Sequence, residues 1–81
     1  EGYSDILIEV PESRTGIVVE IKYAEDAAFD SACNKAIQQI EEKHYEAALL
    51  GDGMENVVKY GIACYKKRCK VVVERINGER D

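Results

Sequence analysis

The sequence is poor in aromatic residues, proline and cysteine, and each shortage excludes a class of protein. It has no tryptophan, one phenylalanine and one proline among 81 residues, so its core must be aliphatic and thin. Three cysteines do not make the even set of a small disulfide-bonded secreted domain, and we expect reduced thiols in the cytoplasm. No apolar run approaches the roughly 18 residues of a membrane-spanning helix, so we expect no membrane association.

What the sequence does contain is typical of one small globular domain. Hydrophobic residues make up 46% and charged residues 33% of the chain, which is too short for two domains. We therefore treat residues 1–81 as a single domain. Because the chain lacks an initiator methionine and begins almost directly on a predicted strand, we expect it to be a piece of a longer protein.

The charge is unevenly spread along the chain. Residues 1–55 hold 13 acids and 4 bases, whereas residues 56–81 hold 3 acids and 7 bases, for a formal net charge of −5. An acidic protein does not bind nucleic acid through its whole surface. The basic cluster Lys66, Lys67, Arg68 and Lys70 is either a local clamp for phosphates or, as is more common, a solvated turn.

Hydrophobic periodicity predicts two strands, a helix and two further strands. Alternation predicts strands over 3–10 and 17–23, joined by a short turn at 11–16 into a hairpin. The period then changes to that of an amphipathic helix from about Ala27 to Leu50, either straight or with a bend, ending at Gly51 and Gly53. Strands are expected over 57–65 and 69–76, the last with an apolar run, Val71 to Val73, long enough for burial on both faces.

This order predicts the α/β class with a small mixed β-sheet, strand–strand–helix–strand–strand. The helix is long enough to serve as a crossover that lays the third strand parallel to a strand of the first hairpin. Self-association is a further expectation, because a thin core and an exposed sheet edge favour it.

Ionisable side chains gather on one face of the predicted hairpin. Glu20 and Lys22 lie two apart on a strand and so share a face, onto which the hairpin brings Asp5 and Glu9. If the turn pairs Val10 with Ile17, Asp5 lies opposite Lys22 and diagonal to Glu20. Neighbouring carboxylates repel unless a cation lies between them, and such oxygen ligands suit Mg²⁺ or Mn²⁺. A lysine beside a metal-bound water fits phosphodiester hydrolysis.

The alternative is that Glu20 and Lys22 are an ordinary charged pair on an exposed strand face, because a Glu-x-Lys triplet is common by chance. The surrounding sequence favours the functional interpretation. An aspartate lies on the preceding strand, the triplet lies inside an apolar strand, and a glutamine follows at the edge of the helix's apolar stripe.

Several stretches in one order resemble the PD-(D/E)XK nuclease superfamily, and within it the small domain often found C-terminal to predicted AAA-type ATPases. The stretches are Gly2 to Ile8, Val18 to Lys22, Ala36 to Tyr45 and Val58 to Lys67. The resemblance implies a restriction-endonuclease-like core lacking its first helix. It also implies metal binding by Asp5 and Glu20, catalysis by Lys22, support from Gln39, and a helix motif ending at Tyr45. Ser4 stands where the superfamily name has proline.

The first hypothesis is a divalent-metal-dependent nuclease domain that acts on DNA or RNA, with an AAA-type ATPase domain in the same chain. The second is a non-catalytic, nuclease-like interaction or regulatory module attached to such an ATPase. Gln39 is as readily a solvated helix residue as a functional one. His44 is more readily a boundary residue than a ligand, and the cysteines are packing thiols, because zinc needs four ligands.

Overall fold

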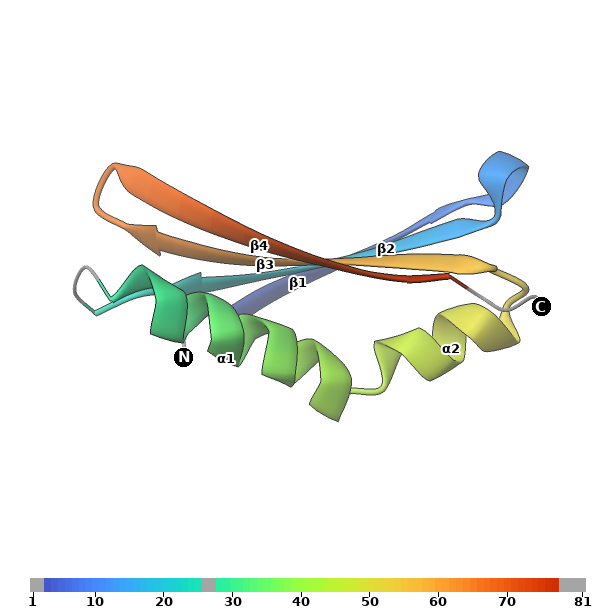
Figure 1. The fold of residues 1–81 in the computed structure, drawn as a ribbon, viewed down its shortest axis with the longest axis horizontal. Coiled ribbons are helices and arrows are strands. Elements are labelled where there is room, and N and C mark those ends of the chain that lie inside the picture. Colours follow the sequence, from blue (N-terminus) through green and yellow to red (C-terminus); the bar gives the residue numbers. More distant parts are fainter. Residues whose placement is uncertain (1–2, 26–27, 78–81) are drawn as a thin grey trace.

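A mixed four-stranded sheet forms one layer of the protein, and two helices form the other (Figure 1). The structure is a computed structural model that describes residues 3–25 and 28–77. The strands are β1 (Tyr3–Val10), β2 (Thr15–Tyr23), β3 (Asn56–Tyr65) and β4 (Arg68–Asn77), and they lie in the order β1-β2-β3-β4. The outer pairs are antiparallel, and β2 and β3 are parallel. The predicted α/β class, mixed sheet and parallel crossover are therefore confirmed.

The crossover between β2 and β3 contains two helices, where the sequence predicted one helical stretch that was either straight or bent. They are α1 (Phe29–Glu42) and α2 (Tyr45–Gly51), and both cover the same face of the sheet (Figure 1). The break falls at His44, whose φ of 60° is left-handed although it is not a glycine. The predicted start at Ala27 lies outside the described residues. No helix in the described part of the chain combines the length and apolarity that a membrane span requires.

The register of the first hairpin differs from the one predicted. A 3₁₀ turn (Pro11–Ser13) and a left-handed Arg14 (φ 51°) connect the strands, so that Val10 pairs with Thr15 rather than with Ile17. This shift of two residues along β2 preserves which side chains share a face. It places Asp5 directly opposite Glu20, not opposite Lys22.

The core lies between the sheet and the helices, and helix α1 approaches the sheet closely. It consists of aliphatic and small residues of α1, α2, β2, β3 and the segment before β3: Val18, Ile37, Ile40, Leu49, Met54 and Val57, with Ala32, Cys33 and Ala63 beside them. Gly61 permits the approach, because a Cβ there would lie 2.9 Å from the Cys33 carbonyl oxygen and from the Ile37 side chain. Gly61 is the β3 partner of Glu20, so α1 lies closely over the position of that acid.

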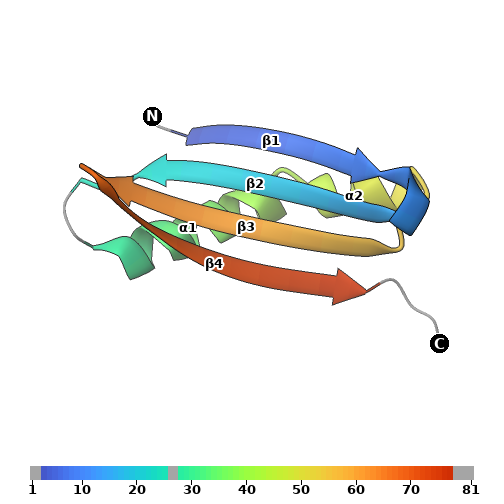
Figure 2. The ribbon, with the colours of Figure 1, turned by 90° about the horizontal axis from the view of Figure 1, so that it is seen from above.

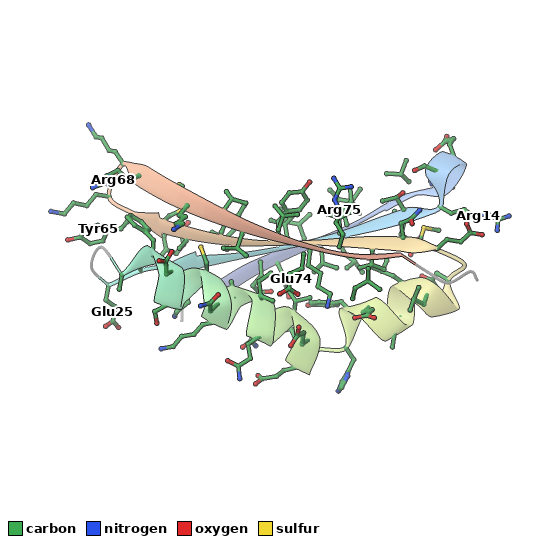
Figure 3. The ribbon with its side chains drawn as sticks, in the orientation of Figure 1. Arg14, Glu25, Tyr65, Arg68, Glu74 and Arg75 are labelled. Atoms are coloured by element: carbon green, nitrogen blue, oxygen red, sulfur yellow. The ribbon has the colours of Figure 1, made fainter. Side chains whose placement is uncertain are left out.

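The opposite face of the sheet is apolar and uncovered by any described element, as Figure 2 shows with both helices behind the strands. Alternation places on this face Ile6, Ile8, Ile17, Val19, Ile21, Val58, Tyr60, Ile62, Val71 and Val73. In β4, Arg75 points to this side and Glu74 to the helix side (Figure 3). Val71 and Val73 are 48% and 46% exposed, so the prediction that β4 is buried on both faces is wrong.

Candidate functional site

Asp5 and Glu20 form the centre of the candidate site. They are direct partners in β1 and β2, and both lie on the face that the helices cover. Side chains of directly opposed residues in an antiparallel pair begin about 4.5–5.5 Å apart at their Cβ atoms. The two carboxylates are therefore close enough to bind one cation together.

Glu20 is a buried carboxylate without a hydrogen bond. Its exposed fraction is 0%, and no described group donates a hydrogen bond to Oε1 or Oε2. Burial raises the pKa of Glu20, the negative charge of Asp5 raises it further, and the positive charge of Lys43 opposes both. A carboxylate in this condition has two unused acceptor oxygens, which a metal ion could satisfy.

Two residues at the junction of α1 and α2 contact this pair of acids. The Lys43 ammonium donates a hydrogen bond to Asp5 Oδ2 at 2.9 Å and lies 3.7 Å from Glu20 Oε2. The Tyr45 hydroxyl donates a hydrogen bond to the same Asp5 oxygen. These hydrogen bonds lower the pKa of Asp5, and the bonds to Asp5 raise the pKa of both Lys43 and Tyr45.

Lys22 lies on the helix-facing side of β2, two residues beyond Glu20. It lines an open pocket of about 180 Å³ at the start of α1, together with Ala28, Ser31 and Lys35. The cation between the two carboxylates is Lys43, on which sequence reasoning placed no role. Gln39 is half-buried on α1, one turn before Lys43, so the helix carries it along the side that reaches the acids.

A second ionic group lies beside the first and was not predicted. The Lys59 side chain is 3% exposed, and its ammonium lies 3.1 Å from Glu46 and 3.9 Å from Glu41, one acid from each helix. Its position could have been found from the alternation of β3, because Lys59 falls between Val57 and Gly61 on the inward face. These ion pairs fix both helices to the sheet on either side of their junction.

The remaining sequence candidates lie apart from the acids. Glu9 lies on the same face of β1, four residues from Asp5, and its neighbour there is Asp52, whose carboxyl raises the Glu9 pKa. His44 is exposed at the helix break. Within residues 3–25 and 28–77, no three His, Cys, Asp or Glu side chains gather as a metal-binding group.

The fold and the site together define a small α/β domain that presents one aspartate and one buried glutamate from a hairpin beneath a helix. Residues 1–74 match the family model described as "PD-(D/E)XK nuclease superfamily". The chain belongs to this superfamily and is a nuclease-like domain. No curated protein and no solved structure matches it.

Proposed function

We propose that the protein is a divalent-metal-dependent nuclease domain that hydrolyses nucleic-acid phosphodiesters. One observation carries the proposal: Asp5 faces Glu20, and the buried Glu20 has two oxygens without a hydrogen bond. A buried acid of this kind, beside a second acid, destabilises the fold unless a cation or a proton neutralises it. Membership of the superfamily, whose nucleases usually use divalent metals, favours a metal ion.

The residues present fit Mg²⁺ or Mn²⁺. Mg²⁺ is commonly held by one or two carboxylates and keeps several of its waters, so Asp5 and Glu20 suffice as protein ligands. The bound metal would supply an acidified water and charge stabilisation at the reacting phosphate. The Tyr45 hydroxyl would hold Asp5 in place through the hydrogen bond that the structure contains.

Lys22 and Gln39 are the proposed catalytic residues. The Lys22 ammonium, on the same strand face as Glu20, would orient the attacking water and stabilise the charge that develops on the phosphate oxygens. Gln39 would support the lysine or the water from α1. Each role depends on charge or hydrogen bonding at the side-chain tip, so Lys22→Met and Gln39→Leu should lower activity while the fold persists.

The proposed substrate is DNA or RNA, and its backbone would approach over the end of the sheet that carries Lys22. Register places Lys22, Ala63 and Lys70 in one row on the helix-facing side. The β3–β4 turn, with Lys66, Lys67 and Arg68, projects just beyond this row. A local group of cations next to an acidic site is what a phosphate backbone requires, even on a protein of net negative charge.

The uncovered apolar face favours a second candidate function, an interaction module. Strand spacing and rise give this face a projected area of roughly 450 Å², and apolar patches of this size are often functional. We propose an AAA-type ATPase domain of the same chain, or a second copy, as the partner. Analytical ultracentrifugation tests whether a second copy of the chain covers this face, because a protein that stays monomeric at all concentrations would exclude that partner.

Mn²⁺ titration followed by amide NMR tests the metal site directly. Site-selective paramagnetic broadening centred on Asp5, Glu20 and Ile21 is expected in the wild type and should be absent from Glu20→Gln. Glu42→Gln is the matched control, because Glu42 is an exposed acid at the end of α1. Equal broadening in all three proteins would refute the site.

Nuclease activity is then measured with Mg²⁺ or Mn²⁺ on single-stranded, duplex and branched DNA and on RNA, using the full-length protein. Metal-dependent cleavage that is lost in Glu20→Gln supports the proposed function. A full-length protein that binds Mn²⁺ at Asp5 and Glu20 but cleaves none of these substrates supports the interaction module instead.

A further inference from the structure

Lys43 lies where a metal ion would have to bind. Its ammonium is 2.9 Å from Asp5 Oδ2 and 3.7 Å from Glu20 Oε2, so it lies between the two carboxylates proposed as ligands. An ammonium group and a divalent cation cannot share such a position, because both their volumes and their charges conflict. A metal ion bound by the two oxygens that Lys43 now contacts, Asp5 Oδ2 and Glu20 Oε2, would therefore displace the lysine.

The lysine satisfies the two acids only in part. It donates a hydrogen bond to Asp5, whereas its contact with Glu20 is a longer ion pair, and both Glu20 oxygens remain without a hydrogen bond from any described residue. One positive charge also faces two carboxylates. A divalent cation would match that charge and approach both acids more closely, which gives it an advantage over the lysine.

The connection of Lys43 to the fold allows its side chain to leave while the helices stay in place. Lys43 follows the last residue of α1, and its side chain is 34% exposed at the surface, outside the aliphatic core. The junction is anchored independently on each side of Lys43. Tyr45 contacts Asp5, and Glu41 and Glu46 both contact the buried Lys59. Rotation of the lysine side chain into solvent would therefore break no core contact.

We propose that Lys43 is an internal counter-cation: it partly neutralises Asp5 and Glu20 in the metal-free protein and is displaced when a divalent cation binds. Lys43 thereby sets the metal concentration at which the site fills. It is a positioning residue, since it acts through the two acids. The inference rests on the proposed metal site and adds that the Lys43 ammonium competes with the metal ion for Asp5 and Glu20.

Mn²⁺ affinity of lysine variants of the 81-residue chain tests the proposal. Lys43→Met removes the charge and retains an unbranched side chain, and it should tighten Mn²⁺ binding on the order of tenfold or more, because Mn²⁺ then has no ammonium ion pair to break and charges within about 4 Å attract even in a high dielectric. Lys35→Met is the matched control, since Lys35 is an exposed lysine on the same helix. Its affinity should remain within about twofold of the wild type, because exposed charges farther apart than about 10 Å are screened by salt.

Two further measurements keep the test decisive if Lys43→Met folds poorly. Lys43→Arg retains the cation and should bind Mn²⁺ no more tightly than the wild type. In the wild type, diamagnetic Mg²⁺ should shift the Lys43 side-chain nitrogen resonance at the same concentrations that shift the amide of Glu20. The Lys35 resonance should not move with them.

The outcomes separate the two proposals. Tighter binding in Lys43→Met alone supports the internal counter-cation. Site-selective binding in the wild type that is unchanged or weakened in Lys43→Met, or a Lys43 resonance unmoved by Mg²⁺, overturns it and leaves the metal site standing. No site-selective Mn²⁺ binding in any of the proteins overturns both.

Discussion

Replacing Glu20 by glutamine should stabilise the metal-free protein at neutral pH. The variant keeps the size of the side chain and removes a buried charge that no described residue hydrogen-bonds. Its nearest cation, Lys43, is held more closely by Asp5, at 2.9 Å against 3.7 Å, so the lysine keeps a partner after the change. An unsatisfied buried polar group costs about 1–3 kcal/mol and a charged one costs more, so the glutamine amide keeps the first cost and the variant removes the excess that is due to the charge. We therefore expect a gain of at least about 1 kcal/mol, or about 4–8 °C in Tm for a domain of this size.

The pH dependence of that gain provides a second check. Burial raises the folded-state pKa of Glu20, so this group favours folding most at pH values below its unfolded pKa and loses that contribution as pH rises through the folded pKa. Glutamine does not titrate. The advantage of Glu20→Gln should be absent below the ordinary glutamate pKa, about 4.3, and should grow as pH rises through the raised folded-state pKa of Glu20. Asp5 titrates in both proteins and largely cancels in the comparison.

Thermal and urea unfolding in the presence of a chelator measures this difference. Glu42→Gln is the control and should stay within about 0.5 kcal/mol of the wild type, because Glu42 is exposed. Metal should narrow the difference: a tenfold excess of Mg²⁺ over its Kd adds about 1.4 kcal/mol to the wild type and little to the variant. A variant less stable than the wild type at pH 7 without metal would refute the description of Glu20 as an unsatisfied charge.

Three further predictions concern the packing around the site. Gly61→Ala should lower the free energy of unfolding by about 1–3 kcal/mol, because the added Cβ would press on a backbone carbonyl. Gly51→Ala, whose Cβ would have no atom within 4 Å, should leave the free energy of unfolding unchanged, and urea titration of both variants measures the difference. Lys59→Met should change the free energy of unfolding by less than about 1 kcal/mol, because it replaces a buried ammonium by an apolar chain and leaves two partly exposed glutamates that water can solvate. A loss above about 2 kcal/mol in calorimetry would contradict this prediction. The Cys33 thiol is buried, and burial raises its pKa, so it should resist alkylation in the folded protein while the exposed Cys69 reacts, as mass spectrometry would show.

The strands and their faces were predictable because the period of two survives any local detail of the turn. Ile6, Ile8 and Val10 alternate with Asp5, Leu7 and Glu9 in the sequence as they do in the sheet. The length of the crossover predicted that the third strand is parallel to one strand of the hairpin, and the structure shows that this strand is β2. Periodicity does not predict the register of the hairpin. The conformation of the turn, with a left-handed Arg14, fixes which residues of β1 and β2 face each other.

The part played by Lys43 could not be read from the sequence for a related reason. A continuous helix through 27–50 leaves Lys43 as one more polar residue on its surface. The chain instead changes direction at His44, a residue type with no strong preference for the left-handed conformation, and this break aims Lys43 and Tyr45 at Asp5. Contacts between segments 38 and 40 residues apart depend on such breaks, and local propensity does not determine them.

The composition of the site depends on the number of residues in the turn between β1 and β2, because that number helps to set which residues of the two strands face each other. If the turn keeps its conformation, one added residue among 11–14 would shift the register by one, so that Ile6 would face Glu20 and Asp5 would lie on the uncovered face. Two added residues would return Asp5 to the helix-facing side, opposite Lys22, with Leu7 opposite Glu20. A protein that shares this site should therefore either connect the same paired residues by a turn of another conformation, or combine a turn of odd length difference with a compensating bulge in β1.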